Sequence, residues 1–354
     1  MTATTATKAP RPPRVLRAPG GLSVRLHPRS VLVVALLLAC ALAASVVLIG
    51  SGDYPMEPTD VLRTLTGGGT GAQEFIVREL RLPRVVVGLL AGAALGLAGA
   101  VFQSVTRNPL GSPDVLGLAQ GATTGALLVI VLWHGDTASV AAGAAAGGLA
   151  AGAAIYALAW RKGVHGYRFV LVGVGVAAVL TALIGYLLTK AGLTDAARAT
   201  VWMVGSLTGR GWEQVWPLLG ACAVLVPLAL GHGRSLRMLE MGDDTAYALG
   251  VRVERVRIGA LGTAVLLTTA ATAAAGPIAF VALAAPQVAR RLTRAPGPNL
   301  FAATCTGAAL LTGADLAAQR LFGADRLPVG AFTGMAGGCY LLWLLFTERR
   351  AGRI

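Results

Sequence analysis

The sequence predicts an all-α, polytopic membrane bundle of about ten transmembrane helices. Composition is the first reason, since 55% of the 354 residues are hydrophobic and 13% are charged, whereas a soluble domain carries about 25% charged residues. The second is that the apolar residues form runs of about 20 residues, the length that crosses a hydrocarbon core. The third is that the charged residues gather in short segments between these runs.

The chain opens with residues 1–29, a basic stretch rich in Pro, Thr and Ala. Its lack of apolar content predicts a disordered tail. The first apolar run, Val31–Gly50, contains no charge and is longer than the core of a signal peptide. No clean A-x-A cleavage site follows it, so we expect a retained span.

Residues 30–350 then form one transmembrane domain. Its spans are expected near 31–50, 84–104, 114–132, 139–160, 168–189, 213–231, 258–275, 278–290, 299–319 and 328–347. Only Gly276 and Pro277 separate the seventh span from the short eighth one. A membrane helix interrupted in this way requires protein or a cavity to cover its backbone. Small residues fill segments such as Ala141–Gly152, which predicts close helix packing.

An even number of spans places both termini on one side of the membrane. The positive-inside rule makes that side cytoplasmic, because most of the 30 Lys and Arg then lie inside. They occupy the N-terminal tail, the loop 232–257 and the C-terminal end. The sequence therefore predicts a multi-pass protein of the cytoplasmic membrane, embedded in the lipid bilayer, with both termini cytoplasmic.

Several functions are disfavoured by what the chain contains. The net charge of +14 does not follow one basic face, which argues against nucleic acid as a partner. The four cysteines lie in apolar spans without a C-x-x-C pair, so no metal site is indicated. No glycine-rich phosphate loop, H-E-x-x-H or G-x-S-x-G motif occurs, so we predict no enzymatic activity in this chain.

Ionisable residues are nearly missing from the predicted spans, and Asp315 is the clearest exception. A carrier driven by an ion gradient usually buries several carboxylates or histidines as relays. That alternative is therefore disfavoured but stays open. Asp315 itself has two interpretations, a hydrogen-bonding role within the bundle or a functional one.

Two polar segments stand out. Arg81 and Arg84 begin the second span on its outer side. They either snorkel at a helix end or bind an acidic partner. The loop 232–257 carries mixed charges around Met241–Gly250, a composition that favours a protein-contact surface over a lipid-binding patch, with a solvated loop as the alternative.

Five motifs in one order identify a resemblance. They are L-P-R…G-A-A-L-G-L-A-G-A-V-F-Q…R-N-P-L-G-S-P-D-V-L-G over 81–117, W-M-V-G-S-L over 202–207, G-D-D-T-A-Y-A-L-G-V-R-V-E-R-V-R over 242–257, A-G-P-I-A-F-V-A-L-A-A-P-Q-V-A-R-R-L over 275–292 and L-P-V-G-A-F-T-G over 327–334. Together they resemble the FecCD-type permeases of iron–siderophore and vitamin B12 ABC importers.

This resemblance implies the type II permease architecture of ABC importers and transport of a ferric siderophore. A second permease, identical or paralogous, would complete the pathway. Two ATPase subunits would bind ATP and Mg, so no cofactor is expected in this chain. A siderophore-binding protein would dock outside.

The resemblance also assigns roles to residues. Those implied for contact with the ATPase are Gly242, Asp243, Asp244, Ala246, Leu249 and Gly250. Arg81 and Arg84 match arginines that dock the binding protein, and Arg320 lies one place after the position of a third. The inner gate would involve Gly166 and Tyr167, with Gly173, Gly175 and Ala177 along the path.

One departure bears on substrate. The common V-P-H-I-A-R appears here as Ala285-Pro-Gln-Val-Ala-Arg290, which resembles permeases of the ferric-enterobactin kind. Cobalamin and haem remain alternative substrates.

Overall fold

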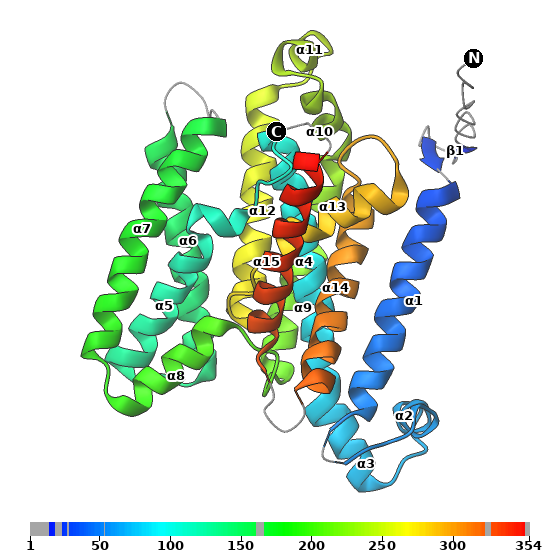
Figure 1. Ribbon diagram of the computed structural model, residues 1–354, viewed down its shortest axis with the longest axis vertical. Helices are drawn as coiled ribbons and strands as arrows, with labels where there is room; N and C mark the ends of the chain where they lie inside the picture. Colours follow the sequence, from blue (N-terminus) through cyan, green and yellow to red (C-terminus); the bar gives the residue numbers. More distant parts are fainter. Residues whose placement is uncertain are drawn as a thin grey trace.

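The computed structural model describes residues 14–17, 23–26, 28–52, 54–160, 166–322 and 327–350. Within these residues ten helices lie at the predicted spans, in the predicted order, so the all-α bundle is confirmed (Figure 1). They are α1 (Pro28–Gly50), α4 (Leu82–Thr106), α5 (Leu118–Trp133), α6 (Thr137–Ala159), α7 (Gly166–Lys190), α9 (Trp212–Gly231), α12 (Val253–Ala275), α13 (Val281–Thr293), α14 (Leu300–Leu321) and α15 (Val329–Arg350).

Shorter elements cap the two ends of the bundle. They are α2 (Pro58–Leu65), α3 (Gly71–Phe75), the π-helix η1 (Ile76–Arg81), the 3-10 helix η2 (Pro113–Leu116), α8 (Leu193–Val204), α10 (Gly233–Glu240) and α11 (Asp243–Ala248). Figure 1 shows α2, α3 and α8 at one end. At the opposite end lie α10 and α11, together with the start of α1 and the end of α15.

Part of the N-terminal tail is ordered in the structure. Strands β1 (Arg14–Arg17) and β2 (Ser23–Leu26) pair antiparallel, with Arg14 opposite Leu26. The sequence predicted disorder over residues 1–29 and did not predict this hairpin. The remainder of that tail lies outside the described residues, apart from the first turn of α1.

Helix α4 forms the centre of the bundle. Its membrane-crossing window is 78% buried inside the subunit, whereas that of α7 is 17% buried. Figure 1 agrees, with α4 surrounded by α9, α12 and α14, and with α7 and α1 on opposite outer sides. Most of the surface of α7 is therefore left for lipid or for a partner.

Glycines set the closest helix contacts, as the small-residue content predicted. A Cβ atom at Gly92 on α4 would lie 2.5 Å from the carbonyl oxygen of Gly307 on α14. A Cβ atom at Gly143 on α6 would lie 2.7 Å from the carbonyl oxygen of Gly125 on α5. No side chain fits at either place, so these backbones touch directly, as small residues allow in membranes.

The break between α12 and α13 is covered by protein. Gly276 has a φ of 77°, which only glycine adopts without strain. The Ser206 amide donates to the carbonyl of Ala275 at 2.9 Å, and the Gly330 amide donates to the carbonyl of Gly205 at 3.1 Å. The last carbonyl of α12 is thus satisfied by a neighbouring segment, and that segment is itself held by the start of α15.

Candidate functional site

Helix α11 projects beyond the bundle at one end, and α10 lies beneath it (Figure 1). Gly242 and Gly250 bound α11 with φ values of 114° and 82°, so both turns require glycine. Ala246 on α11 is buried, whereas Tyr247 is 77% and Leu249 is 57% exposed. These exposed apolar side chains make α11 a candidate protein contact.

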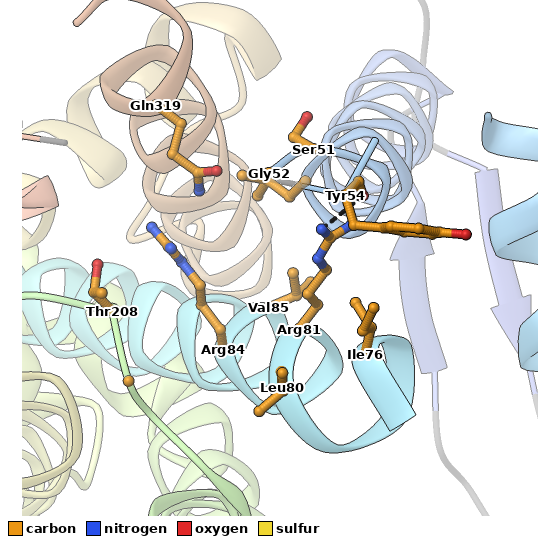
Figure 2. Close-up of a pocket in the computed structure, with 12 residues that line it drawn as sticks. Ser51, Gly52, Tyr54, Ile76, Leu80, Arg81, Arg84, Val85, Thr208 and Gln319 are labelled. Atoms are coloured by element: carbon orange, nitrogen blue, oxygen red, sulfur yellow. Dashed lines mark hydrogen bonds between the residues drawn. The ribbon is translucent and has the colours of Figure 1, made fainter. Parts of the chain in front are cut away.

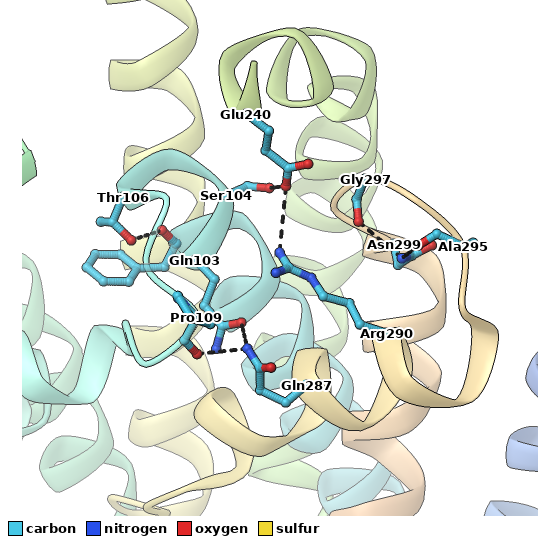
Figure 3. A network of polar contacts seen from close by, with 11 residues as sticks. Gln103, Ser104, Thr106, Pro109, Glu240, Gln287, Arg290, Ala295, Gly297 and Asn299 are labelled. Atoms are coloured by element: carbon cyan, nitrogen blue, oxygen red, sulfur yellow. Dashed lines mark hydrogen bonds and ion pairs between the residues drawn. The ribbon is translucent and has the colours of Figure 1, made fainter. Parts of the chain in front are cut away.

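Two carboxylates fasten this segment to the bundle. The Arg257 guanidinium on α12 donates to Asp243 at 2.8 Å, and Arg107, which follows α4, lies 3.4 Å from the same carboxylate. Glu240 accepts a short hydrogen bond from Ser104 on α4. It also pairs with Arg290 on α13 at 3.6 Å (Figure 3). The segment is therefore tied to three different helices.

A buried amide pair lies beside these contacts (Figure 3). The Gln287 amide donates to the Gln103 side chain and to the carbonyl of Pro109, both at 2.8 Å. Gln103 is 2% exposed and donates to the carbonyl of Leu283 at 3.1 Å. Gln287 thus joins α13 to the loop that follows α4.

The opposite end holds the arginines predicted to dock a partner (Figure 2). Arg84 makes a two-point contact with Asp315 on α14, at 2.6 Å and 3.1 Å. Arg81 donates to the carbonyls of Ile49 and Tyr54, at 2.7 Å and 2.8 Å, and so caps the end of α1.

Arg320 is exposed and donates to the Ser51 hydroxyl at 3.0 Å. All three predicted arginines therefore lie at one end, and each already has a contact within the chain. The Asp315 side chain is 2% exposed and pairs with Arg84 inside the bundle.

A cavity of about 400 Å³ opens beside Arg81 and Arg84. Its wall includes Ser51, Thr208 and Gln319 from three other segments (Figure 2). None of the described residues that line it carries a carboxylate. The described lining therefore combines two guanidinium groups at one wall with a largely apolar remainder that includes Leu48, Ile76 and Leu80.

Helix α7 carries the residues predicted for the gate and the path. Gly173 is buried, and a Cβ atom there would lie 2.7 Å from the Leu116 side chain. Ala177, one turn later, packs on Gly117. Gly173 and Ala177 are four residues apart and share the face of α7 that packs against the inside of the subunit. Gly175 lies on the exposed face of the helix.

Gly166 and Tyr167 begin α7, and their side chains lie outside the described residues. Their predicted role at a gate, and those of Gly173, Gly175 and Ala177 along a path, stay predictions. Among the described residues, no group of three His, Cys, Asp or Glu side chains could hold a metal ion.

Sequence reasoning assigned no role to the side chains that tie α10–α11 to the bundle: Ser104, Arg107, Glu240, Arg257 and Arg290. The sequence did show that polar residues occur where the apolar spans end. It could not show which of them form pairs, because the partners are distant from one another in sequence.

Known proteins with similar sequences cover almost the whole chain. The profile of the FecCD transport family matches residues 31–347. The ferric enterobactin transport system permease protein FepG of Escherichia coli is 45% identical over 89% of this chain and 97% of its own length. The achromobactin transport system permease protein CbrC of Dickeya dadantii is 37% identical over 89% of this chain and 91% of its own length.

A solved structure shares the fold. A metal-chelate type ABC transporter in an inward-facing conformation superposes with a TM-score of 0.76, at 23% identity, over 90% of this chain and 99% of that one. At this identity the likeness concerns the fold alone.

Proposed function

Since this chain belongs to the FecCD transport family, we propose that it is the permease subunit of an ABC importer that carries a ferric siderophore across the cytoplasmic membrane. The observation that carries the proposal is the 45% identity to a ferric enterobactin permease over nearly its full length. The placement of two candidate interfaces at opposite ends of one bundle supports it. Cobalamin and haem are the alternative substrates.

The end with α10 and α11 faces the cytoplasm in this proposal. Basic residues gather there, on α10, on the start of α12 and on the end of α13. The positive-inside rule assigns such an end to the cytoplasm. The start of α1 and the end of α15 lie at the same end (Figure 1), which supports a cytoplasmic position for both termini.

The partners follow from the two ends. ATPase subunits, which bind ATP and Mg, contact α11 through Tyr247 and Leu249. A siderophore-binding protein docks at the other end, near Arg81, Arg84 and Arg320. A second permease, identical or paralogous, packs on the outer side of α7, where Leu171, Val174 and Val179 are among the exposed side chains.

Transport then proceeds by alternating access. Movement of the ATPases displaces α11, and the ion pairs of Asp243 and Glu240 carry that displacement into α4, α12 and α13. The energy comes from the different affinities of the partners for each state of the permease, as coupling between sites requires. No phosphate-binding loop is needed in this chain, because its partner performs the hydrolysis.

Uptake of radiolabelled ferric siderophores into vesicles tests this proposal. The vesicles contain this chain, the ATPase and the binding protein of the same transport system. We expect uptake that depends on ATP and disappears when either partner is omitted. Transport of cobalamin or haem alone would overturn the iron assignment, and uptake that survives without ATP but collapses with an uncoupler would indicate an ion-driven carrier.

A further inference from the structure

The pair Arg84–Asp315 bears on how the outer partner binds, and the inference rests on the proposed function. Arg84 has five N–H groups in a planar fork. Asp315 accepts from Nε and Nη2, at 3.1 Å and 2.6 Å. Arg84 also lines the cavity, whereas Asp315 does not.

Burial differs between the two partners. The Asp315 side chain is 2% exposed and the Arg84 side chain is 18% exposed. The Gln319 amide also donates to Asp315 at 3.2 Å. The carboxylate is thus fixed inside the subunit, while the guanidinium reaches the surface. A buried carboxylate held by several donors keeps its position.

This arrangement has two opposite effects on an approaching carboxylate. It holds Arg84 in one orientation, which reduces the entropy lost on binding. It also places a negative charge directly behind the guanidinium, so the attraction felt by a second carboxylate is largely cancelled. The second effect is the larger one, because charge–charge interactions in a partly buried site are screened weakly.

We propose that Asp315 is an internal competitor for the carboxylate of the binding protein: it orients Arg84 towards the cavity and weakens docking by neutralising it. The cavity suits a carboxylate side chain, since the described lining residues include two guanidinium groups and no acid. Asp315 is therefore a positioning residue that sets the strength of docking without touching the partner.

Binding of the siderophore-binding protein to the permease–ATPase complex in lipid nanodiscs tests this. Asp315→Asn keeps the size of the side chain and removes its charge. We expect the dissociation constant to fall about tenfold. Because the site is partly buried, added salt should reduce this gain only slightly. The variant is also expected to melt at a lower temperature, because Arg84 loses its buried partner.

Two controls separate docking from stability. Arg84→Ala combined with Asp315→Asn should bind no more tightly than Arg84→Ala alone, since the gain acts through Arg84. Asp195→Asn removes a carboxylate on α8, at the same end of the bundle, that pairs with His134 at 2.9 Å. This control should leave docking unchanged.

An unchanged or larger dissociation constant for Asp315→Asn, with normal docking of the wild type, would overturn the inference and leave the proposed function intact. Equal tightening by Asp195→Asn would also overturn it, because the effect would then reflect net charge alone. No docking of the binding protein to the wild type would instead contradict the proposed function.

Discussion

The contact between Arg257 and Asp243 offers the sharpest test of how α11 is connected to the bundle. The Arg257 side chain is 12% exposed and lies 2.8 Å from Asp243. Replacing it by Gln removes the charge and leaves Asp243 with Arg107 at 3.4 Å, where both side chains are nearly half exposed. A charge-assisted hydrogen bond contributes about 1.5–3 kcal/mol, and the exposure of Asp243 reduces this to about 1–2 kcal/mol.

Because about 1.4 kcal/mol corresponds to a factor of ten, Arg257→Gln should lower the equilibrium constant between seated and displaced α11 by about tenfold. The assay measures ATP hydrolysis and siderophore uptake in the same proteoliposomes. We expect hydrolysis to continue, while the amount of siderophore carried per ATP falls, with that factor as the upper limit.

Arg255→Gln is the matched control, since it is the same substitution two positions earlier on α12, at an exposed side chain. It should leave the ratio of uptake to hydrolysis unchanged. Equal behaviour of the two variants would refute the reasoning. A parallel fall of hydrolysis and uptake would also refute it, because that result indicates lost assembly and not lost coupling.

Two further predictions follow from the structure. Gly307→Ala should destabilise the bundle by about 1–3 kcal/mol, because its Cβ would meet the backbone of Gly92. Gly313→Ala is the control, since a Cβ there meets open space, and melting of the two purified variants checks the difference. Leu249→Arg should abolish co-purification with the ATPase, since Leu249 is exposed directly after α11; normal co-purification would exclude that contact.

The sequence predicted those parts of the fold that depend on local pattern. Apolar runs placed all ten spans, because crossing a bilayer demands about 20 apolar residues in succession. The short α13 was also predicted, since Gly276 and Pro277 interrupt an apolar stretch. Contacts between distant segments were not predictable in this way. The close approach of Gly205 to the Pro277 carbonyl depends on the packing of separate helices.

The same difference between local pattern and long-range contact applies to the candidate site. The arginines Arg81 and Arg84 and the loop around Asp243 could be picked out because charge is rare in such a chain. The contacts that each of these residues makes could not be predicted from the sequence. Arg84 and Asp315 are 231 positions apart, and the sequence left the role of Asp315 open. Gly173 and Ala177 were expected along a path, yet helical spacing places them on the face of α7 that packs on η2 and Gly117.

Helix α4 connects the two ends of the molecule. It begins beside Arg81 and Arg84 and ends beside Ser104 and Arg107, as one continuous helix of 25 residues. Such a helix spans about 37 Å at 1.5 Å per residue. Its central position and direct backbone contact with Gly307 leave it little freedom to bend. We therefore expect a displacement imposed at Ser104 and Arg107 to move Arg84 as well, so that in the proposed importer α4 would connect the docking end with the ATPase end.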